Sequence, residues 1–508
     1  MSGQSQALWD RWFRRTAESQ EYWQSVRENA KSQLALRHQL HSVQKTQTAS
    51  EAELSDAERR CDEAQGAFSL RQKLWLEKVE EREALRRLFP ELRWPADVSA
   101  LEQDDFQIKG LWQDAELNKL RSELFAAALQ LHEAWLAQVC RQNAGFRANI
   151  FAVSELLSNK RPQDDAHFLP IWQSLFLMVP VVSSTFASFA NQFRGLGPGT
   201  LGWVFIDEAG QAVPQAAVGA LFRAQRSIIV GDPLQIEPVF AVAIRLIGAL
   251  SELSPVTAGR EYALNNTSVQ RLADRANRFG ALLIREDGSP DLFVGSPLRV
   301  HCRCIDPMFK VSNRIAYQEK MIFGLKSREQ DDGPPMRCKS AWIDIKGSVR
   351  NNQEVVAQTD FVSELVFRIY QRDRKLPFLY IISPFKAVAK ALKSALGPDE
   401  WRQKIGNLKP PNKTDLTEWL KQRIGTVHTF QGKEEDTVTM VLGVDNQTLG
   451  AAAWASSKPN LLNVALTRAK RRFFIVGDQT VWSPMNYFDE ARRELPVRTG
   501  AEILGTVN

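Results

Sequence analysis

Two short apolar runs, each ended abruptly by polar residues, stand out near the middle of the chain. Residues 204–206 (VFI) precede Asp207 and Glu208, and residues 227–230 (SIIV) precede Gly231 and Asp232. Continuous rather than alternating hydrophobicity predicts parallel strands that are buried on both faces. Because ligands of such sheets collect at the carboxyl ends of the strands, the polar ends of these two runs form the candidate site.

The N-terminal part has a helical pattern instead. Residues 4–65 contain neither Gly nor Pro and are rich in good helix formers, which predicts one long helix that is broken near Pro90. Apolar positions at 54, 57, 61, 64 and 68 have coiled-coil spacing, and a second helix is predicted over 115–140. We interpret residues 1–150 as a helical stalk. It is either a packing element or an arm that guides nucleic acid.

Further strands are predicted at 179–185, 379–383 and 438–442, and a helix begins near Lys386. The fold class is therefore α/β, with parallel sheets behind the stalk. We divide the remainder into a first domain over 151–292 and a second over 293–508.

Composition narrows the class of protein only moderately. The 508 residues are 44% hydrophobic and 24% charged, as in globular proteins, and the net charge of +6 is compatible with a polyanionic partner. The five cysteines form no CxxC pair, which favours a reducing compartment. With neither a signal peptide nor an apolar run of membrane-spanning length, we expect a cytoplasmic protein without a membrane partner.

Adjacent carboxylates at a strand end suit a magnesium nucleotide. One of Asp207 and Glu208 is expected to hold the ion and the other to orient an attacking water, while Gln211 and Gln235 add neutral hydrogen-bonding groups that could sense a terminal phosphate. The alternative is that the Asp-Glu pair merely caps the following helix.

Five ordered segments carry a family resemblance. DEAGQ (207–211) and GDPLQIEP (231–238) resemble motifs II and III of superfamily 1 helicases, in the branch of the nonsense-mediated-decay helicase and its bacterial AAA relatives. The segment 295–309 resembles the motif that carries an arginine, here Arg303, although Cys302 replaces the aromatic residue that many relatives have. Segments 424–436 and 463–478 resemble motifs V and VI.

The resemblance implies two RecA-like domains, the first incomplete, with ATP and Mg²⁺ bound between them. The residues it assigns to catalysis are Asp207 (also the metal ligand), Glu208, Gln235, Arg303 and Arg468. Those assigned to the nucleotide are Gln211, Asp232, Gln431, Gly432 and Glu434. Those assigned to single-stranded nucleic acid are Thr185, Ser383, Lys386, Thr426 and His428. Alternatives stay open for Thr185, Ser383 and Lys386: a serine-rich turn, a helix cap and a solvated lysine.

One family feature is missing. The sequence contains no GxxxxGK[ST] loop, and its only Gly-Lys pair, Gly432-Lys433, lies within motif V. The chain therefore resembles the C-terminal portion of an ATP-dependent helicase, with a partner chain or a missing N-terminal segment supplying the phosphate loop. The expected substrate is single-stranded nucleic acid, DNA rather than RNA. The alternative is an inactive nucleic-acid-binding or scaffold remnant.

Overall fold

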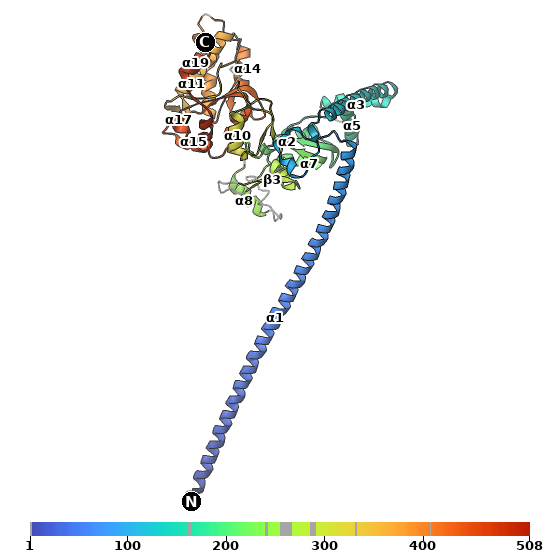
Figure 1. The fold of residues 1–508 in the computed structure, drawn as a ribbon, viewed down its shortest axis with the longest axis vertical. Helices are drawn as coiled ribbons and strands as arrows, with labels where there is room; N and C mark the ends of the chain where they lie inside the picture. The colour runs from blue at the N-terminus through green and yellow to red at the C-terminus, as the bar shows by residue number, and fades with distance from the viewer. Residues whose placement is uncertain are drawn as a thin grey trace. The chain divides into compact units, whose positions relative to one another are not determined.

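The computed structural model describes residues 3–160, 162, 164–238, 242–253, 267–284, 291–330, 333–406 and 408–507. The chain divides into two compact units, Met1–Trp94 and Pro95–Asn508. The first unit is a single helix of 86 residues, α1 (Gly3–Leu88; Figure 1). It ends two residues before Pro90, whose ring and missing N–H oppose helix continuation. The long helix is thus confirmed, whereas Leu54 and Phe68 are solvent-exposed and their coiled-coil role stays a prediction.

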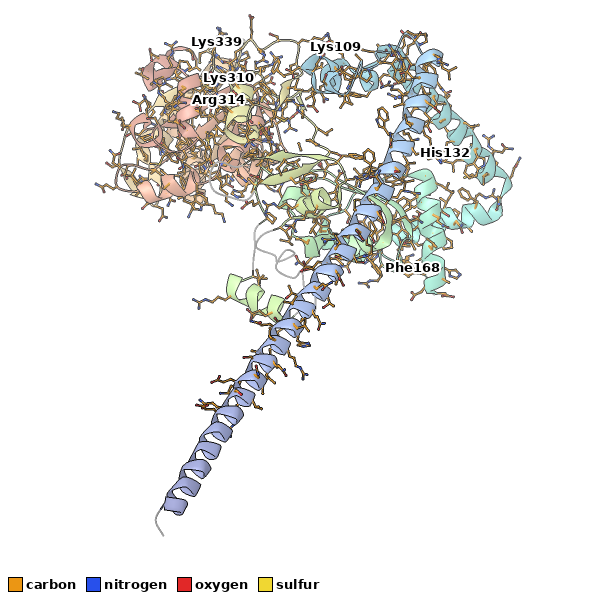
Figure 2. The ribbon with its side chains drawn as sticks, turned by 60° about the horizontal axis from the view of Figure 1, so that its bottom comes forward. Lys109, His132, Phe168, Lys310, Arg314 and Lys339 are labelled. Carbon is orange, nitrogen blue, oxygen red and sulfur yellow. The ribbon has the colours of Figure 1, made fainter. Side chains whose placement is uncertain are left out.

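The second unit begins with a helical region. Its helices are α2 (Asp104–Lys109), α3 (Ala115–Gln142), α4 (Ala144–Leu157), α5 (Phe168–Met178) and α6 (Phe186–Gln192). Asp114 caps α3 by accepting a hydrogen bond from the Leu117 amide at 2.8 Å, which explains why the predicted second helix begins there. His132 Nε2 lies 2.6 Å from the Leu177 carbonyl and ties α3 to the end of α5, the helix that starts at Phe168 (Figure 2).

A two-stranded parallel sheet follows, formed by β1 (Leu201–Ile206) and β2 (Ala224–Ile229) with α7 (Pro214–Arg223) between them. Val204 and Ile206 are buried in a core shared with Trp172 of α5 and Ala217 of α7. The opposite face is bare, with exposed fractions of 52% for Trp203, 67% for Phe205, 41% for Ile228 and 46% for Val230. The prediction that both faces are buried was wrong, because the described residues cover only one face.

The predicted strand at 179–185 was also wrong. This segment has no strand pairing, and Thr185 caps α6, its side chain accepting a hydrogen bond from the Ser188 amide at 3.2 Å. A β-branched run becomes a strand only where a neighbouring edge pairs with it, and β1 pairs only with β2 among the described residues. After β2 come α8 (Ile244–Leu253), α9 (Val269–Ala276) and the antiparallel pair β3 (Gly280–Leu283) and β4 (Leu292–Gly295).

The larger sheet has six parallel strands in the order β11-β10-β12-β13-β7-β14, which confirms the α/β fold class. The strands are β7 (Ala341–Asp344), β10 (Tyr380–Ser383), β11 (Ile424–Thr426), β12 (Glu435–Val441), β13 (Ala469–Gly477) and β14 (Val497–Thr499). Continuous apolar runs such as 473–476, all fully buried, make the strands of this sheet as predicted.

The helices of this region are α10 (Met308–Tyr317), α11 (Val356–Asp373), α12 (Lys386–Ala395), α13 (Pro398–Lys404), α14 (Lys413–Arg423), α15 (Leu449–Ala455), α16 (Asn460–Arg468), α17 (Gln479–Trp482), α18 (Phe488–Glu494) and α19 (Gly500–Gly505). Two short pairs, β5 (Val300–His301) with β6 (Ile322–Phe323) and β8 (Val349–Asn351) with β9 (Glu354–Val355), complete the fold. Lys310 and Arg314 on α10 (Figure 2) form ion pairs with Glu494 and Glu490 on α18, at 2.8 and 2.7 Å. None of the described helices has the length and apolar character that a bilayer crossing requires.

Candidate active site

Glu208 is held from two sides at the end of β1. Its Oε2 accepts hydrogen bonds from Gln211 Nε2 at 3.0 Å and from Gln431 Nε2 at 3.4 Å. Its backbone has φ of 53°, a left-handed conformation that is uncommon outside glycine and that occurs at functional sites. The Gln431 contact joins the two predicted domains at a carboxylate that the sequence assigned to catalysis.

The ends of β1 and β2 approach each other through two glycines. A Cβ on Gly231 would lie 2.8 Å from the Gly210 nitrogen, and one on Gly210 would lie 2.8 Å from the Asp232 carbonyl oxygen. Only glycine permits this approach. The DEAGQ and GDPLQIEP segments are therefore brought together, as the parallel arrangement predicted.

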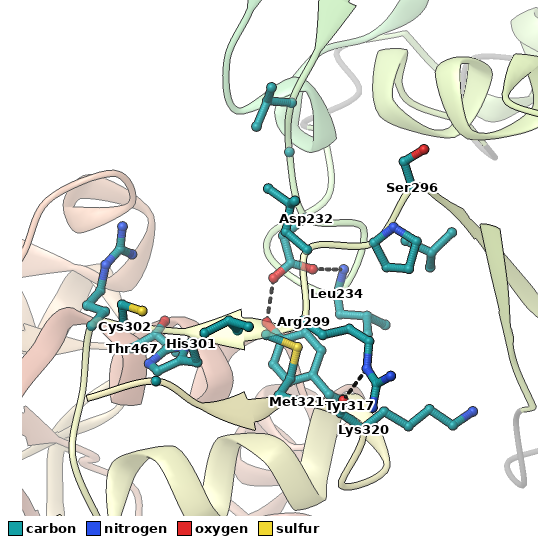
Figure 3. Close-up of a pocket in the computed structure, with 18 of the residues that line it drawn as sticks. Asp232, Leu234, Ser296, Arg299, His301, Cys302, Tyr317, Lys320, Met321 and Thr467 are labelled. Carbon is teal, nitrogen blue, oxygen red and sulfur yellow. Dashed lines mark hydrogen bonds between the residues drawn. The ribbon is translucent and has the colours of Figure 1, made fainter. Parts of the chain in front are cut away.

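Asp232 organises the turn that follows β2. Its carboxylate accepts hydrogen bonds from the Leu234 amide at 2.8 Å, from Gln235 Nε2 at 3.1 Å and from the Tyr317 hydroxyl (Figure 3). Burial raises the pKa of Asp232, and the hydrogen bond from Tyr317 is the largest of the effects that oppose this shift. The Gln235 Oε1 atom is buried and has no partner among the described residues, so it is available to a ligand.

A second cluster surrounds Glu434. Its carboxylate pairs with Lys470 Nζ at 2.6 Å and with Arg303 Nε at 3.1 Å. The hydrogen bond from Lys470 is the main reason that the pKa of Glu434 is lowered. Since all three side chains are about 40% exposed, the pairs add little stability and leave Arg303 accessible.

Arg468 is fully buried at the end of α16. Its guanidinium donates to the carbonyls of Val464 and Lys433 at 3.1 and 3.0 Å. Burial lowers the pKa of Arg468 to about 10, the charge of Arg303 acts in the same direction, and Glu208 opposes it. Arg468 therefore lies within electrostatic range of Glu208 and of the Arg303–Glu434 pair, although its side chain is fully buried.

Sequence reasoning missed the pair beside Arg303. His301 Nε2 accepts a hydrogen bond from the Cys304 amide at 3.0 Å and lies 2.9 Å from its Sγ. Burial lowers the pKa of His301 to about 4 and raises that of Cys304 to about 12, so both side chains are neutral at pH 7. The pair fixes the backbone around Arg303, and the His-x-x-Cys spacing was the available signal.

A cleft of about 2280 Å³ adjoins these groups. Four predicted site residues, Asp232, Gln235, Arg303 and Glu434, line it, whereas Asp207 and Glu208 do not. Figure 3 shows Asp232 beside other lining residues such as Arg299 and His301. Arg278, Lys320 and Lys326 add positive charge, and no ion pair involving any of them is found within the described ranges. The cleft is therefore suited to an anionic ligand.

Asp207 is the only predicted metal ligand. Its exposed carboxylate accepts the Glu208 amide at 2.9 Å. The described residues contain no cluster of three or more His, Cys, Asp or Glu side chains placed to hold a metal ion. Because Mg²⁺ is commonly bound by one or two carboxylates together with substrate phosphates, Asp207 fits an ion that arrives with a nucleotide.

The structure groups four of the five residues assigned to nucleic acid. Ser383 and Thr426 are paired residues of the neighbouring strands β10 and β11. Lys386 and His428 follow these strands and are exposed. They lie close enough to interact, because the pKa of His428 is lowered first by burial and then by the Lys386 charge. Ser383 is fully buried and accepts a hydrogen bond from the Phe385 amide at 3.2 Å, which supports the alternative of a local cap. Thr185 is exposed, and its hydroxyl forms hydrogen bonds with Ser188 within the same turn.

Comparisons with known proteins agree with the motifs. Two family models, both described as an AAA domain, match residues 3–241 and 296–480. An uncharacterized ATP-dependent helicase of Mycoplasma genitalium is 26% identical over 358 residues, which cover 68% of this chain. The chain spans 28% of the length of that relative.

Two solved structures of the arterivirus nonstructural protein 10 helicase are also similar. The one with DNA is 14% identical, with 56% of this chain and 42% of that chain covered and a TM-score of 0.24. The other is 13% identical, with 63% and 59% covered and a TM-score of 0.25.

The parallel sheets and the two AAA matches define an AAA-domain protein. Together with the ordered motifs and the curated relative, they identify it as a superfamily 1 helicase-like protein.

Proposed function

We propose that the chain forms the C-terminal part of an ATP-dependent helicase, which couples ATP hydrolysis to movement along single-stranded nucleic acid and to duplex unwinding. The observation that carries this proposal is the contact between Glu208 and Gln431. Through this contact, the carboxylate that follows β1 lies against the second domain. The charges of Glu208 and of Arg303 both act on the pKa of Arg468. A carboxylate facing cations across a domain interface suits phosphoryl transfer to water.

Each residue then has a task. Glu208 orients the attacking water and accepts its proton, held in place by Gln211 and Gln431. The free Oε1 of Gln235 receives a hydrogen bond from the water or from a protonated group of the ligand. Arg303 stabilises charge on the phosphate oxygens, and buried Arg468 contributes a fixed field. Mg²⁺, when bound with ATP, would neutralise phosphate charge and would be held by Asp207.

The phosphate loop comes, in this proposal, from polypeptide outside this chain. The bare face of the β1–β2 sheet supports this part, because parallel sheets are normally covered on both faces and large exposed apolar patches mark interfaces. Ile228 and Val230 belong to that face and also line the cleft, so one covering segment would reach both. On the second domain, exposed Lys386 and His428 and half-buried Thr426 would contact the backbone of a single strand, preferably DNA, while buried Ser383 supports them.

Single-strand-stimulated ATP hydrolysis tests the proposal, measured for this chain and for a version extended upstream in its reading frame. We expect hydrolysis in the extended protein, and Glu208→Gln should lower its rate by roughly a hundredfold or more while nucleotide binding persists. Glu364→Gln is the control, because Glu364 lies on α11 outside the site, in a partly exposed ion pair with Arg368. Binding of single strands without hydrolysis in either version would instead support the inactive scaffold.

A further inference from the structure

A hydrogen-bond network reaches from the turn after β2 into the second domain. Of the three donors to the Asp232 carboxylate, Leu234 and Gln235 belong to the turn itself, whereas Tyr317 comes from the end of α10, 85 residues away (Figure 3). Burial raises the pKa of Tyr317 well above its usual value, so its hydroxyl is protonated and donates at neutral pH.

Helix α16 completes the network. Asn463 Nδ2 donates to the Tyr317 hydroxyl at 3.0 Å and to the Leu234 carbonyl at 3.2 Å, and its Oδ1 accepts from the Ser312 hydroxyl. One turn earlier, Asn460 donates to the Gln235 carbonyl. Asn463 is fully buried, so this network is shielded from water and depends on each partner.

The same helix ends at Arg468. One end of α16 thus holds the turn that carries Gln235, and the other end carries the buried arginine. Because a helix of nine residues moves as a unit, the hydrogen bonds of this network can transmit a displacement of the turn along α16. Tyr317 is the member that connects the Asp232 carboxylate to Asn463.

We propose that Tyr317 is a positioning residue that couples the occupancy of the phosphate site at Gln235 to the position of α16 and Arg468. This inference rests on the proposed function, since it assigns a regulatory link within the same site. Tyrosine is required at this position because its hydroxyl donates to Asp232 and accepts from Asn463. Phenylalanine would fill the same space but lacks that hydroxyl.

Hydrogen exchange on the full chain tests the coupling with Tyr317→Phe. Without ligand, the variant should exchange the amides of Asp232 and of residues 234–236 roughly tenfold faster, the effect of one lost hydrogen bond at this turn. Tyr370→Phe is the matched control, because its hydroxyl donates to the Lys409 carbonyl at 3.0 Å away from this turn. Unchanged exchange at 232–236 in Tyr317→Phe would overturn the proposal.

The second arm adds a non-hydrolysable ATP analogue with magnesium. In the wild type we expect slower exchange both at 232–236 and in α16, and in Tyr317→Phe slower exchange at 232–236 alone. A response of α16 that survives in Tyr317→Phe would refute the coupling while leaving the proposed function intact. If neither this chain nor the upstream-extended version responds to the analogue in its wild-type form, both the coupling and the proposed function are refuted.

Discussion

Gln431 Nε2 lies 3.4 Å from Glu208 Oε2, and a Cβ on the neighbouring Gly432 would lie 3.7 Å from Glu208 Oε1. The segment resembling motif V therefore approaches the segment resembling motif II through both a side chain and the backbone. The approach depends on Gly432 having φ of 78°, a conformation that residues with a side chain rarely adopt.

Gly432→Ala should accordingly lower the free energy of unfolding by about 1 kcal/mol, because alanine is strained at this φ even though space is available. Gly450→Ala is the control. It lies in helix α15 with no atom within 4 Å of its added Cβ, and it should raise the free energy of unfolding by about 0.5 kcal/mol. Urea unfolding measures both, and an equal effect of the two substitutions would contradict the backbone argument.

Arg468→Ala should lower the free energy of unfolding by about 3 kcal/mol, since it leaves the buried carbonyls of Val464 and Lys433 without this donor. The comparison is Arg471→Ala, whose exposed side chain lies 4.0 Å from Asp436 and should change stability by less than about 0.5 kcal/mol. Chemical denaturation of both variants checks this. Similar small losses would show that Arg468 is not structural.

His301 should make the protein acid-sensitive. Its folded-state pKa of about 4 lies below the ordinary value of 6.5, so the unfolded state binds a proton that the folded state excludes. The contribution to stability is complete above pH 6.5 and is lost as the pH falls through 4, with a total of up to about 3 kcal/mol. His301→Gln keeps a hydrogen-bond acceptor without the titration. Urea unfolding at pH 7.5 and pH 5 should show a smaller loss in this variant than in the wild type, and parallel losses would contradict the assignment.

The bare face of the β1–β2 sheet should promote self-association when no covering segment is present. Phe205→Ser should reduce association in analytical ultracentrifugation, with little change in stability because Phe205 is 67% exposed. Phe378→Ser is the control, because Phe378 is equally exposed but belongs to another part of the surface, where it lies beneath Arg423. Equal reduction by both variants would show that the sheet face has no special role.

Local patterns in the sequence determined much of this architecture. The long helix up to Pro90 and the parallel strands follow from helix-forming composition and from continuous apolar runs. These features depend on residues close in sequence, which is why they were predictable. The strand expected at 179–185 was wrong for the complementary reason that a strand needs an edge to pair with.

Contacts between side chains that are distant in the sequence became visible in the folded structure alone. The Asp232–Tyr317 hydrogen bond joins residues 85 positions apart, and no local pattern marks Tyr317 as more than the end of an amphipathic helix. The burial of Arg468 and Ser383 and the exposure of Phe205 were equally hidden, because an apolar run or a motif does not specify what packs against it. Motifs and local patterns were sufficient to indicate the class of protein and its candidate chemistry, whereas the packing of distant segments sets which groups are buried, which are accessible and how they are linked.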